Sequence, residues 1–190
     1  MNEKCDMKCD VKSDMNPGMK SDMKSGFAEA VRHEFDTKVA RVRSLLAAKG
    51  LDAAFIKRQD NFAWLTCGGR NYVGMGDVGN CGLLVTLKGL FAITNNIEAP
   101  RMVAEEHVEE LGFDVRYGVW HDNGFQNRVL AELVPSGRIG FDTGDLADGI
   151  KALRFDLTSE EIERYVAIGN DASRALEEAG MEISVGDSEY

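Results

Sequence analysis

The side chains with the most varied chemistry in this sequence gather in a glycine-rich segment, residues 68–80. Arg70, Asn71 and Tyr72 offer a cation, an amide and a phenol there. Loops held by a rigid scaffold carry many binding residues, and glycine gives this segment the freedom of a loop. We therefore treat the three residues as candidates for the wall of a substrate pocket. The alternative is that Arg70 is solvated and Tyr72 packs at the base of the loop.

The same segment contains the letters of a dinucleotide-binding fingerprint, GMGDVG at residues 74–79. That fingerprint binds a pyrophosphate when a strand precedes it and a helix follows it. Here residues 82–86 follow, and their composition predicts a strand. The order favours a flexible loop. A nicotinamide-dependent enzyme stays as an alternative that a thermal shift with the cofactors can test.

The three histidines, His33, His107 and His121, are widely spaced along the chain. None has a partner at the helical or strand spacing that metal sites use, so the sequence predicts no metal ligands. His33 and His107 are expected on exposed helix faces. His121, between Trp120 and Asp122, is a fourth candidate for the wall of a substrate pocket, against the alternative that it only packs a loop.

Four carboxylates, Asp142, Asp145, Asp148 and Asp156, could serve cation binding or acid–base chemistry. Their irregular spacing favours helix caps and solvated faces instead. No Ser/His/Asp or Cys/His set can be assembled, and no nucleophile elbow is present. We therefore predict no catalytic residue in this chain.

The four cysteines, Cys5, Cys9, Cys67 and Cys81, form no disulfide framework for a domain of this size, and we expect reduced thiols. Cys5 and Cys9 with nearby aspartates raise the alternative of a metal site in the N-terminal segment. That pair lacks the further Cys or His that a closed site needs.

The composition narrows the class of protein. A chain of 190 residues suits one domain, and its net charge of −10 with scattered cations argues against nucleic acid as a partner. No apolar run reaches the roughly 18 residues of a membrane helix. The N-terminus has no secretion signal, so a cytoplasmic protein without a membrane partner is expected.

Alternating helix and strand patterns must position these residues. Residues 27–46 carry apolar side chains on one helical face, and two β-rich runs around a Lys88-Gly89 turn predict a hairpin. The pattern predicts an α/β fold, a single three-layer domain over residues 27–157, with a mixed β-sheet flanked by helices. The remaining elements are expected as strands near residues 53–57, 113–117 and 138–142, a short helix at 61–66, and helical segments at 97–111 and 123–134.

The two ends of the chain differ from this central part. Residues 1–26 form a low-complexity segment with a four-residue repeat, which predicts a disordered tail. Thr158-Ser159-Glu160-Glu161 is a capping box, so a long helix with an apolar stripe should begin there and close at Gly180. Residues 158–190 are thus expected to form a C-terminal linker helix and the start of a further domain.

The order of these elements resembles the N-terminal domain of the creatinase, prolidase and aminopeptidase P family, whose catalytic domain has the pita-bread fold. The resemblance rests on residues 43–46, 50–54, 61–66, 83–86, 158–164 and 186–189. One departure is Cys67, where relatives usually carry glycine. In this family two Asp, one His and two Glu of the catalytic domain bind two metal ions that activate water.

The resemblance implies an accessory domain that shapes the substrate pocket and mediates homodimerisation, and that is inactive alone. The metal pair (Mn, Co or Zn) and the peptide or small amide substrate are expected only with a catalytic domain, which would lie beyond Tyr190. The loop around Arg70, Asn71 and Tyr72 resembles the family loop that borders the active site. The alternative function is a stand-alone module for small-molecule binding or oligomerisation.

Overall fold

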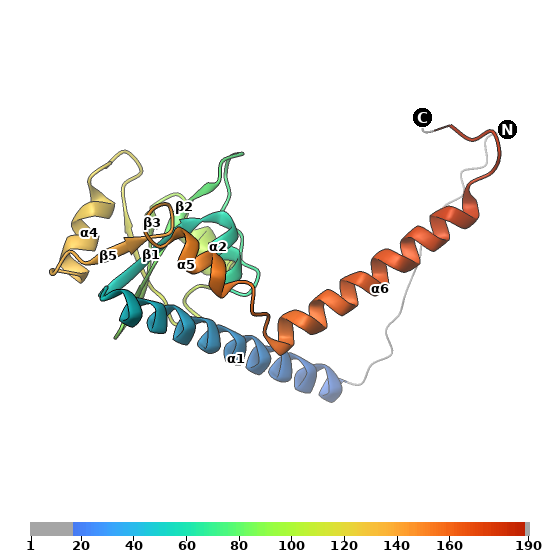
Figure 1. Ribbon diagram of the computed structural model, residues 1–190, viewed down its shortest axis with the longest axis horizontal. Helices are drawn as coiled ribbons and strands as arrows, with labels where there is room; N and C mark the ends of the chain where they lie inside the picture. The colour runs from blue at the N-terminus through green and yellow to red at the C-terminus, as the bar shows by residue number, and fades with distance from the viewer. Residues whose placement is uncertain (1–16, 189–190) are drawn as a thin grey trace.

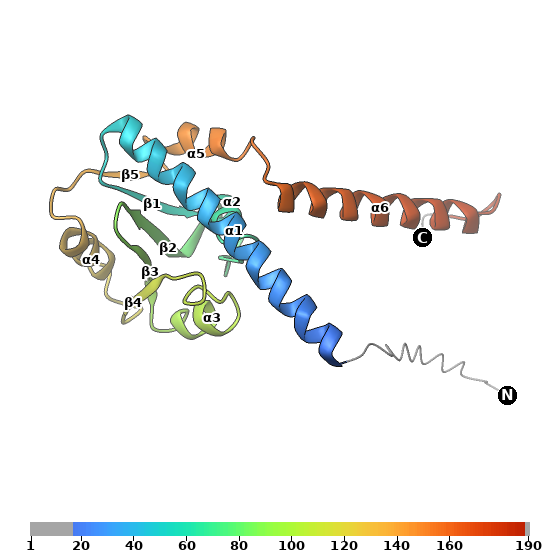
Figure 2. The same cartoon turned by 90° about the horizontal axis from the view of Figure 1, so that it is seen from below.

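The computed structural model describes residues 17–188, which build a mixed five-stranded sheet with the strand order β4-β3-β2-β1-β5. Strands β1, β2 and β3 pair antiparallel, whereas β5 runs parallel to β1 and β4 parallel to β3. The mixed sheet predicted from the sequence is confirmed (Figures 1 and 2). The strands are β1 (Ala53–Arg58), β2 (Val78–Thr86), β3 (Leu90–Asn95), β4 (Asp114–Gly118) and β5 (Ile139–Phe141).

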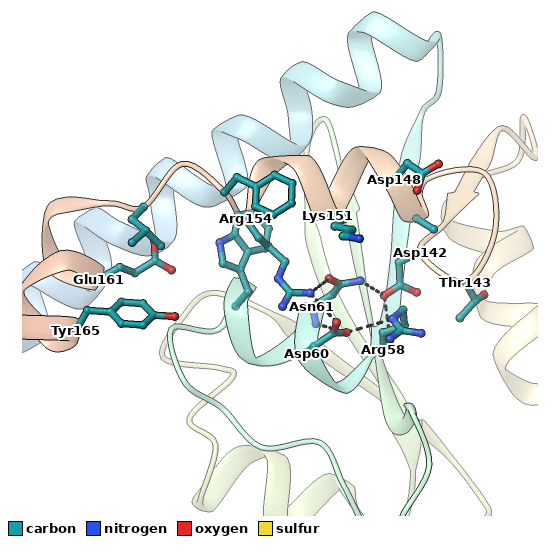
Figure 3. A pocket seen from close by; sticks show the side chains of 14 residues that line it. Arg58, Asp60, Asn61, Asp142, Thr143, Asp148, Lys151, Arg154, Glu161 and Tyr165 are labelled. Atoms are coloured by element: carbon teal, nitrogen blue, oxygen red, sulfur yellow. Dashed lines mark hydrogen bonds and ion pairs between the residues drawn. The ribbon is translucent and has the colours of Figure 1, made fainter. Parts of the chain in front are cut away.

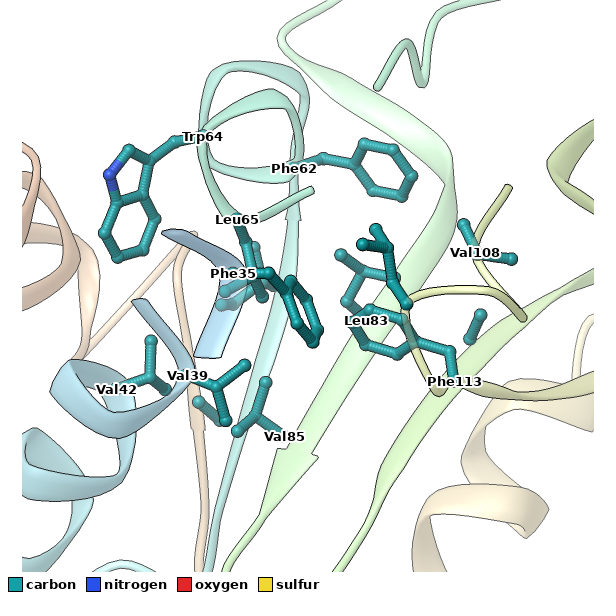
Figure 4. Close-up of a cluster of buried hydrophobic side chains, with 14 of the residues drawn as sticks. Phe35, Val39, Val42, Phe62, Trp64, Leu65, Leu83, Val85, Val108 and Phe113 are labelled. Atoms are coloured by element: carbon teal, nitrogen blue, oxygen red, sulfur yellow. The ribbon is translucent and has the colours of Figure 1, made fainter. Parts of the chain in front are cut away.

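Helices cover both faces of the sheet, because alternate residues of each strand point to opposite sides. Ala54 and Ile56 of β1 join the larger core cluster, which packs under α1, α2, α3 and α5 (Figure 4). Ala53 and Phe55 join a smaller cluster under α4. The result is the predicted three-layer α/β domain. The helices are α1 (Pro17–Lys49), α2 (Gln59–Leu65), α3 (Ala99–Ala104), α4 (Phe125–Leu133), α5 (Ala147–Leu153) and α6 (Ser159–Glu182).

The predicted hairpin of β2 and β3 is present, and a tight turn closes it. The hydroxyl of Thr86 donates to the carbonyl of Gly89 and accepts from its amide. On β2, a Cβ atom at Gly82 would lie 2.0 Å from the ring of Phe55, so only glycine fits there. Strand β2 begins at Val78, so the last two residues of the fingerprint letters at 74–79 already belong to a strand. A dinucleotide-binding fingerprint would lead into a helix instead.

Two boundaries differ from the sequence prediction. Helix α1 begins at Pro17, so the predicted disordered tail is wrong for residues 17–26; proline suits the first helical position, where its missing N–H costs no hydrogen bond. Residues 1–16 of that predicted tail lie outside the described residues. Helix α3 ends at Ala104, because the chain turns back and the amide of Val108 bonds to the carbonyl of Met102.

Helix α5 was not predicted at all. Its seven residues are too short for a clear helical period, and Gly149 lies in the middle of them. That glycine has a packing role, because a Cβ atom there would lie 2.9 Å from the side chain of Leu45 on α1. Loss of helix propensity is therefore offset by close contact between the two helices.

Helix α6 leaves the domain and projects away from it (Figures 1 and 2). Thr158 is its N-cap, and the predicted capping box with Glu161 is present. Beyond the first turn its side chains are exposed. Among the described residues, no helix is long and apolar enough to cross a membrane.

Candidate functional site at the root of helix α6

A cavity of about 640 Å³ lies where the carboxyl ends of β1 and β5 meet helices α2, α5 and the root of α6 (Figure 3). Because β1 and β5 are parallel, the residues that follow them come together at one edge of the sheet. Segments that are far apart in the sequence therefore line one space. They supply Asp60 and Asn61, Asp142, Arg154, and Tyr165 among others.

Asp142 forms the base of this cavity and is 1% exposed. Its Oδ1 accepts from the amide of Lys57 at 3.0 Å, and its Oδ2 accepts from the amide of Arg58 at 2.9 Å and from Asn61 Nδ2 at 3.0 Å. These donors lie where β1 passes into α2, at a helix start that has no side-chain cap of its own. Asp142 thus compensates the N-terminus of α2.

Asp60 lies between two arginines at the rim of the cavity. Arg58 Nε is 3.2 Å and Arg154 Nη1 is 2.6 Å from its carboxylate, and Arg154 Nη1 also donates to Asn61 Oδ1. Burial raises the pKa of Asp60, but the hydrogen bond and charge of Arg154 outweigh it, and the pKa is lowered. The carboxylate therefore stays ionised at neutral pH and is unsuited to act as a general acid.

Several donors in the cavity have no partner among the described residues. The ammonium of Lys151 and the hydroxyl of Tyr165 are two of them, and in Figure 3 the Tyr165 hydroxyl points toward Asp60 and Asn61. The indole N–H of Trp64 also has no partner, but it is buried and is not open to the cavity. Figure 4 shows that this nitrogen points away from the core side chains. A molecule with acceptor oxygens in the cavity would accept hydrogen bonds from Lys151 and Tyr165, which are open to it.

Directly behind the cavity, four charged side chains meet in what we call the root cluster: Glu34 and Lys38 of α1, and Glu161 and Arg164 of α6. Lys38 Nζ lies 2.5 Å from Glu34 and 2.8 Å from Glu161, and Arg164 makes two contacts of 2.8 Å with Glu34. Burial raises the pKa of Glu34, but the hydrogen bonds from Arg164 and Lys38 outweigh it and lower the pKa. In the root cluster two carboxylates and two cations thus attract one another.

The four predicted pocket residues are not gathered at this cavity. The guanidinium of Arg70 is exposed at a second cavity of about 520 Å³, where its Nε lies 3.5 Å from Glu106. Asn71 is 1% exposed. Its side-chain Nδ2 donates to the carbonyl of Cys81, and its Oδ1 accepts from the backbone amide of Cys81. Tyr72 is exposed. His121 is exposed in the β4–α4 loop, with its ring 5.3 Å from that of Trp120.

The second cavity includes two non-glycine residues in the left-handed backbone region, Cys67 and His107, with φ angles of 60° and 51°. Cys67 is the position where glycine was expected from the family resemblance, and the left-handed φ explains that preference. Burial raises the pKa of the Cys67 thiol to about 12, so it is no nucleophile at neutral pH. His107 was expected on a helix face, but it lies in the turn after α3.

The root cluster was missed in the sequence, although two signals for it were present. Glu34 and Lys38 stand four residues apart in a predicted helix, and Glu161 and Arg164 stand three apart in another. Each pair alone is typical of a solvated helix face. What the sequence could not show is that the two helices meet, which depends on the packing of α1 against the sheet.

Within residues 17–188, no group of three or more His, Cys, Asp or Glu side chains could hold a metal ion. The carboxylates at the cavity do not fit a two-metal centre. Both oxygens of Asp142 already accept hydrogen bonds, and Asp60 is engaged by arginines.

Comparisons with known proteins agree with this fold. A family model described as the Creatinase/Prolidase N-terminal domain matches residues 38–162. The prolidase from Pyrococcus horikoshii OT3 has a TM-score of 0.52 at 15% identity, with 80% of this chain and 45% of that chain covered, a likeness of fold alone. No curated protein sequence matches the chain significantly.

Two further solved structures are similar at lower TM-scores. An Xaa-Pro aminopeptidase from Streptococcus pyogenes has a TM-score of 0.42 and 21% identity, covering 66% of this chain and 87% of that chain. An Xaa-Pro dipeptidase from Bacillus anthracis has a TM-score of 0.40 and 17% identity, covering 68% of this chain and 30% of that chain.

Proposed function

Because this chain belongs to the Creatinase/Prolidase N-terminal domain family, we propose that it is the accessory domain of an Xaa-Pro peptidase or creatinase-like metallohydrolase. In this proposal the domain shapes the substrate pocket and pairs two copies of the enzyme. The observation that carries the proposal is the arm-like α6, which leaves the domain beside the 640 Å³ cavity. A catalytic domain that packed along the exposed sides of α6 near its root would lie beside that cavity.

The substrate of such an enzyme would be a peptide or a small amide. The unpartnered donors of Lys151 and Tyr165 support this part of the proposal, since peptides and amides carry acceptor oxygens. The pair of divalent ions (Mn, Co or Zn) belongs to the catalytic domain in this scheme. The described residues of the present chain contribute binding and shape, and no step of the hydrolysis.

Dimerisation is the second part of the proposal. Exposed apolar side chains in the segment before β2 and around the end of β4 support it, since exposed apolar side chains are the kind that an interface buries. They are Tyr72, Val73, Met75, Tyr117, Val119 and Trp120. Light scattering of the purified chain is expected to give twice the mass of 20.9 kDa, and a monomer at high concentration would contradict this part.

A cytoplasmic location completes the proposal. It is supported by Cys67 and Cys81, which are free thiols in the described structure. Reduced cysteines are the rule in the cytosol and uncommon in oxidising compartments.

The alternative function, a stand-alone module that binds a small molecule, is favoured by the same unpartnered donors. A thermal-shift assay with Xaa-Pro dipeptides and with creatine distinguishes an accessory domain from a stand-alone module. The accessory domain should show no saturable shift without a catalytic domain. A stand-alone module should show one that Lys151→Glu removes and that Lys88→Glu, an exposed change on the β2–β3 turn, leaves intact.

A further inference from the structure

We propose that the root cluster of Glu34, Lys38, Glu161 and Arg164 is a lock that sets the direction of α6, so that the helix leaves the domain as a rigid arm. The lock is a property of the described residues. Only its purpose, to hold a catalytic domain at a fixed angle to the 640 Å³ cavity, rests on the proposed function.

The centre of the lock is the ammonium of Lys38, which is 1% exposed. It donates to Glu34 Oε1 at 2.5 Å on α1 and to the carbonyl of Trp64 at 2.7 Å on α2, and its third close contact is Glu161 Oε1 at 2.8 Å on α6. The two hydrogen bonds and the ion pair of this one ammonium reach three different helices. One side chain therefore ties three helices together.

Arg164 adds an angular restraint. Its Nη1 donates to Glu34 Oε2 and its Nη2 to Glu34 Oε1, both at 2.8 Å. A guanidinium that meets a carboxylate through two parallel hydrogen bonds fixes orientation as well as distance. Because Glu34 is fully buried on α1, the contact limits rotation of α6 about its own axis.

Glu161 links the lock to the start of the helix. Its Oε2 accepts from the amide of Thr158 at 2.9 Å, which is half of the capping box, while its Oε1 meets Lys38. The point at which α6 begins is therefore fixed by the same carboxylate that anchors it. Two contacts one turn apart, at residues 161 and 164, then determine a direction.

Among the described residues, no other buried side-chain contact orients α6. Glu161 is the one buried residue of α6, and from Tyr165 onward the side chains are exposed. His33 with Glu160, and Arg41 with the carbonyl of Asp156, add only surface contacts at the root. A helix of 24 residues is about 36 Å long, so a tilt of about 20° at the root would move its tip by about 12 Å.

The charges also make the lock sensitive to single substitutions. Two carboxylates and two cations balance, and the loss of one partner leaves an uncompensated charge in a poorly hydrated place. Arg164 is the best position to test, since its side chain is 44% exposed and the domain core does not depend on it. Lys38 is the more severe position because it is buried.

The test is a distance distribution between spin labels at Lys88, on the β2–β3 turn, and Asn170, on α6, both exposed. The full chain carries Cys5→Ser and Cys9→Ser so that labelling is specific, and it is diluted with unlabelled chain to remove distances between copies. The unsubstituted lock should give one narrow distribution. Arg164→Gln should at least double its width, and Arg164→Lys should fall between the two.

The matched control is Arg174→Gln, which breaks an exposed pair with Asp171 on the same helix and should leave the distribution unchanged. Lys38→Met should broaden it as well, and near-ultraviolet circular dichroism shows whether the core is intact. A broad distribution in the starting chain, or a narrow one in Arg164→Gln, overturns the lock. Neither result depends on peptidase activity, so failure of the lock and failure of the proposed function are told apart.

Discussion

At the scale of single residues, the buried polar side chains of this domain hold the backbone in place. Asp142 accepts three hydrogen bonds at the junction of β1 and α2, and Asn71 joins its loop to β2. Asn71 was predicted to line a substrate pocket, and in the described structure both ends of its amide are already used by Cys81. A sequence shows the type of a polar side chain, but the backbone groups near it depend on the fold.

Asn71→Ala should destabilise the domain by about 1–3 kcal/mol, because it leaves a buried amide and a buried carbonyl of Cys81 without partners. Urea denaturation measures the change. Asn123→Ala, at an exposed loop position, is the matched control and should change the free energy of unfolding by less than about 0.5 kcal/mol. Equal free energies of unfolding for the two variants would show that the hydrogen bonds between Asn71 and Cys81 do not stabilise the fold.

The lowered pKa of Glu34 gives a prediction for acid. A carboxylate whose pKa in the folded protein is below its ordinary value of 4.5 stabilises the fold above that value, and the contribution is lost as pH falls through the folded pKa. Lys38 and Arg164 form ion pairs with Glu34, so the ionised carboxylate is the form that the folded protein stabilises. Glu160, whose pKa is lowered to about 2 by its own backbone amide and by His33, acts in the same direction.

Thermal unfolding between pH 7 and pH 2 should therefore show Glu34→Gln less stable than the parent at neutral pH, with the difference shrinking below pH 4.5. The substitution removes the charge that acid would otherwise neutralise. A difference that stays constant across the range would mean that the carboxylate of Glu34 does not keep its charge through the ion pairs of the root cluster.

At the scale of elements, most strands and helices could be predicted, and the misses have physical causes. The capping box at Thr158 and the hairpin at Lys88-Gly89 were found because their signals are local. Helix α5 and the early end of α3 were missed because they depend on contacts with distant parts of the chain, such as Gly149 against Leu45. The same holds for the root cluster, which requires two helices to meet.

Hydrogen exchange along α6 should reflect its anchoring at one end. Amides near Ile162 should be protected with the domain, and protection should fall toward residue 182, where rates are expected within about tenfold of an unstructured peptide. Exposed helices gain little from propensity alone, and this one has no packing beyond its root. Uniformly slow exchange along α6 in a monomeric sample would contradict this picture.

At the scale of the whole molecule, the domain is a three-layer scaffold with a cavity at one edge and an arm beside it. The family resemblance inferred from the sequence is confirmed by the match over residues 38–162. The place of the cavity could not be predicted, since it arises where residues 58–61, 142–143, 151–154 and 161–165 meet in space. The role of these parts in an enzyme remains our proposal.

The measurement that tests this account most directly is peptidase activity of the purified chain on Xaa-Pro dipeptides with Mn²⁺, Co²⁺ or Zn²⁺ added. An accessory domain should show no turnover above a metal-only blank, because the described residues contain no group of three or more His, Cys, Asp or Glu side chains that could hold a metal ion. Metal-dependent turnover that persists in the Cys5→Ser, Cys9→Ser chain would contradict the account, since a catalytic centre would then exist within these residues.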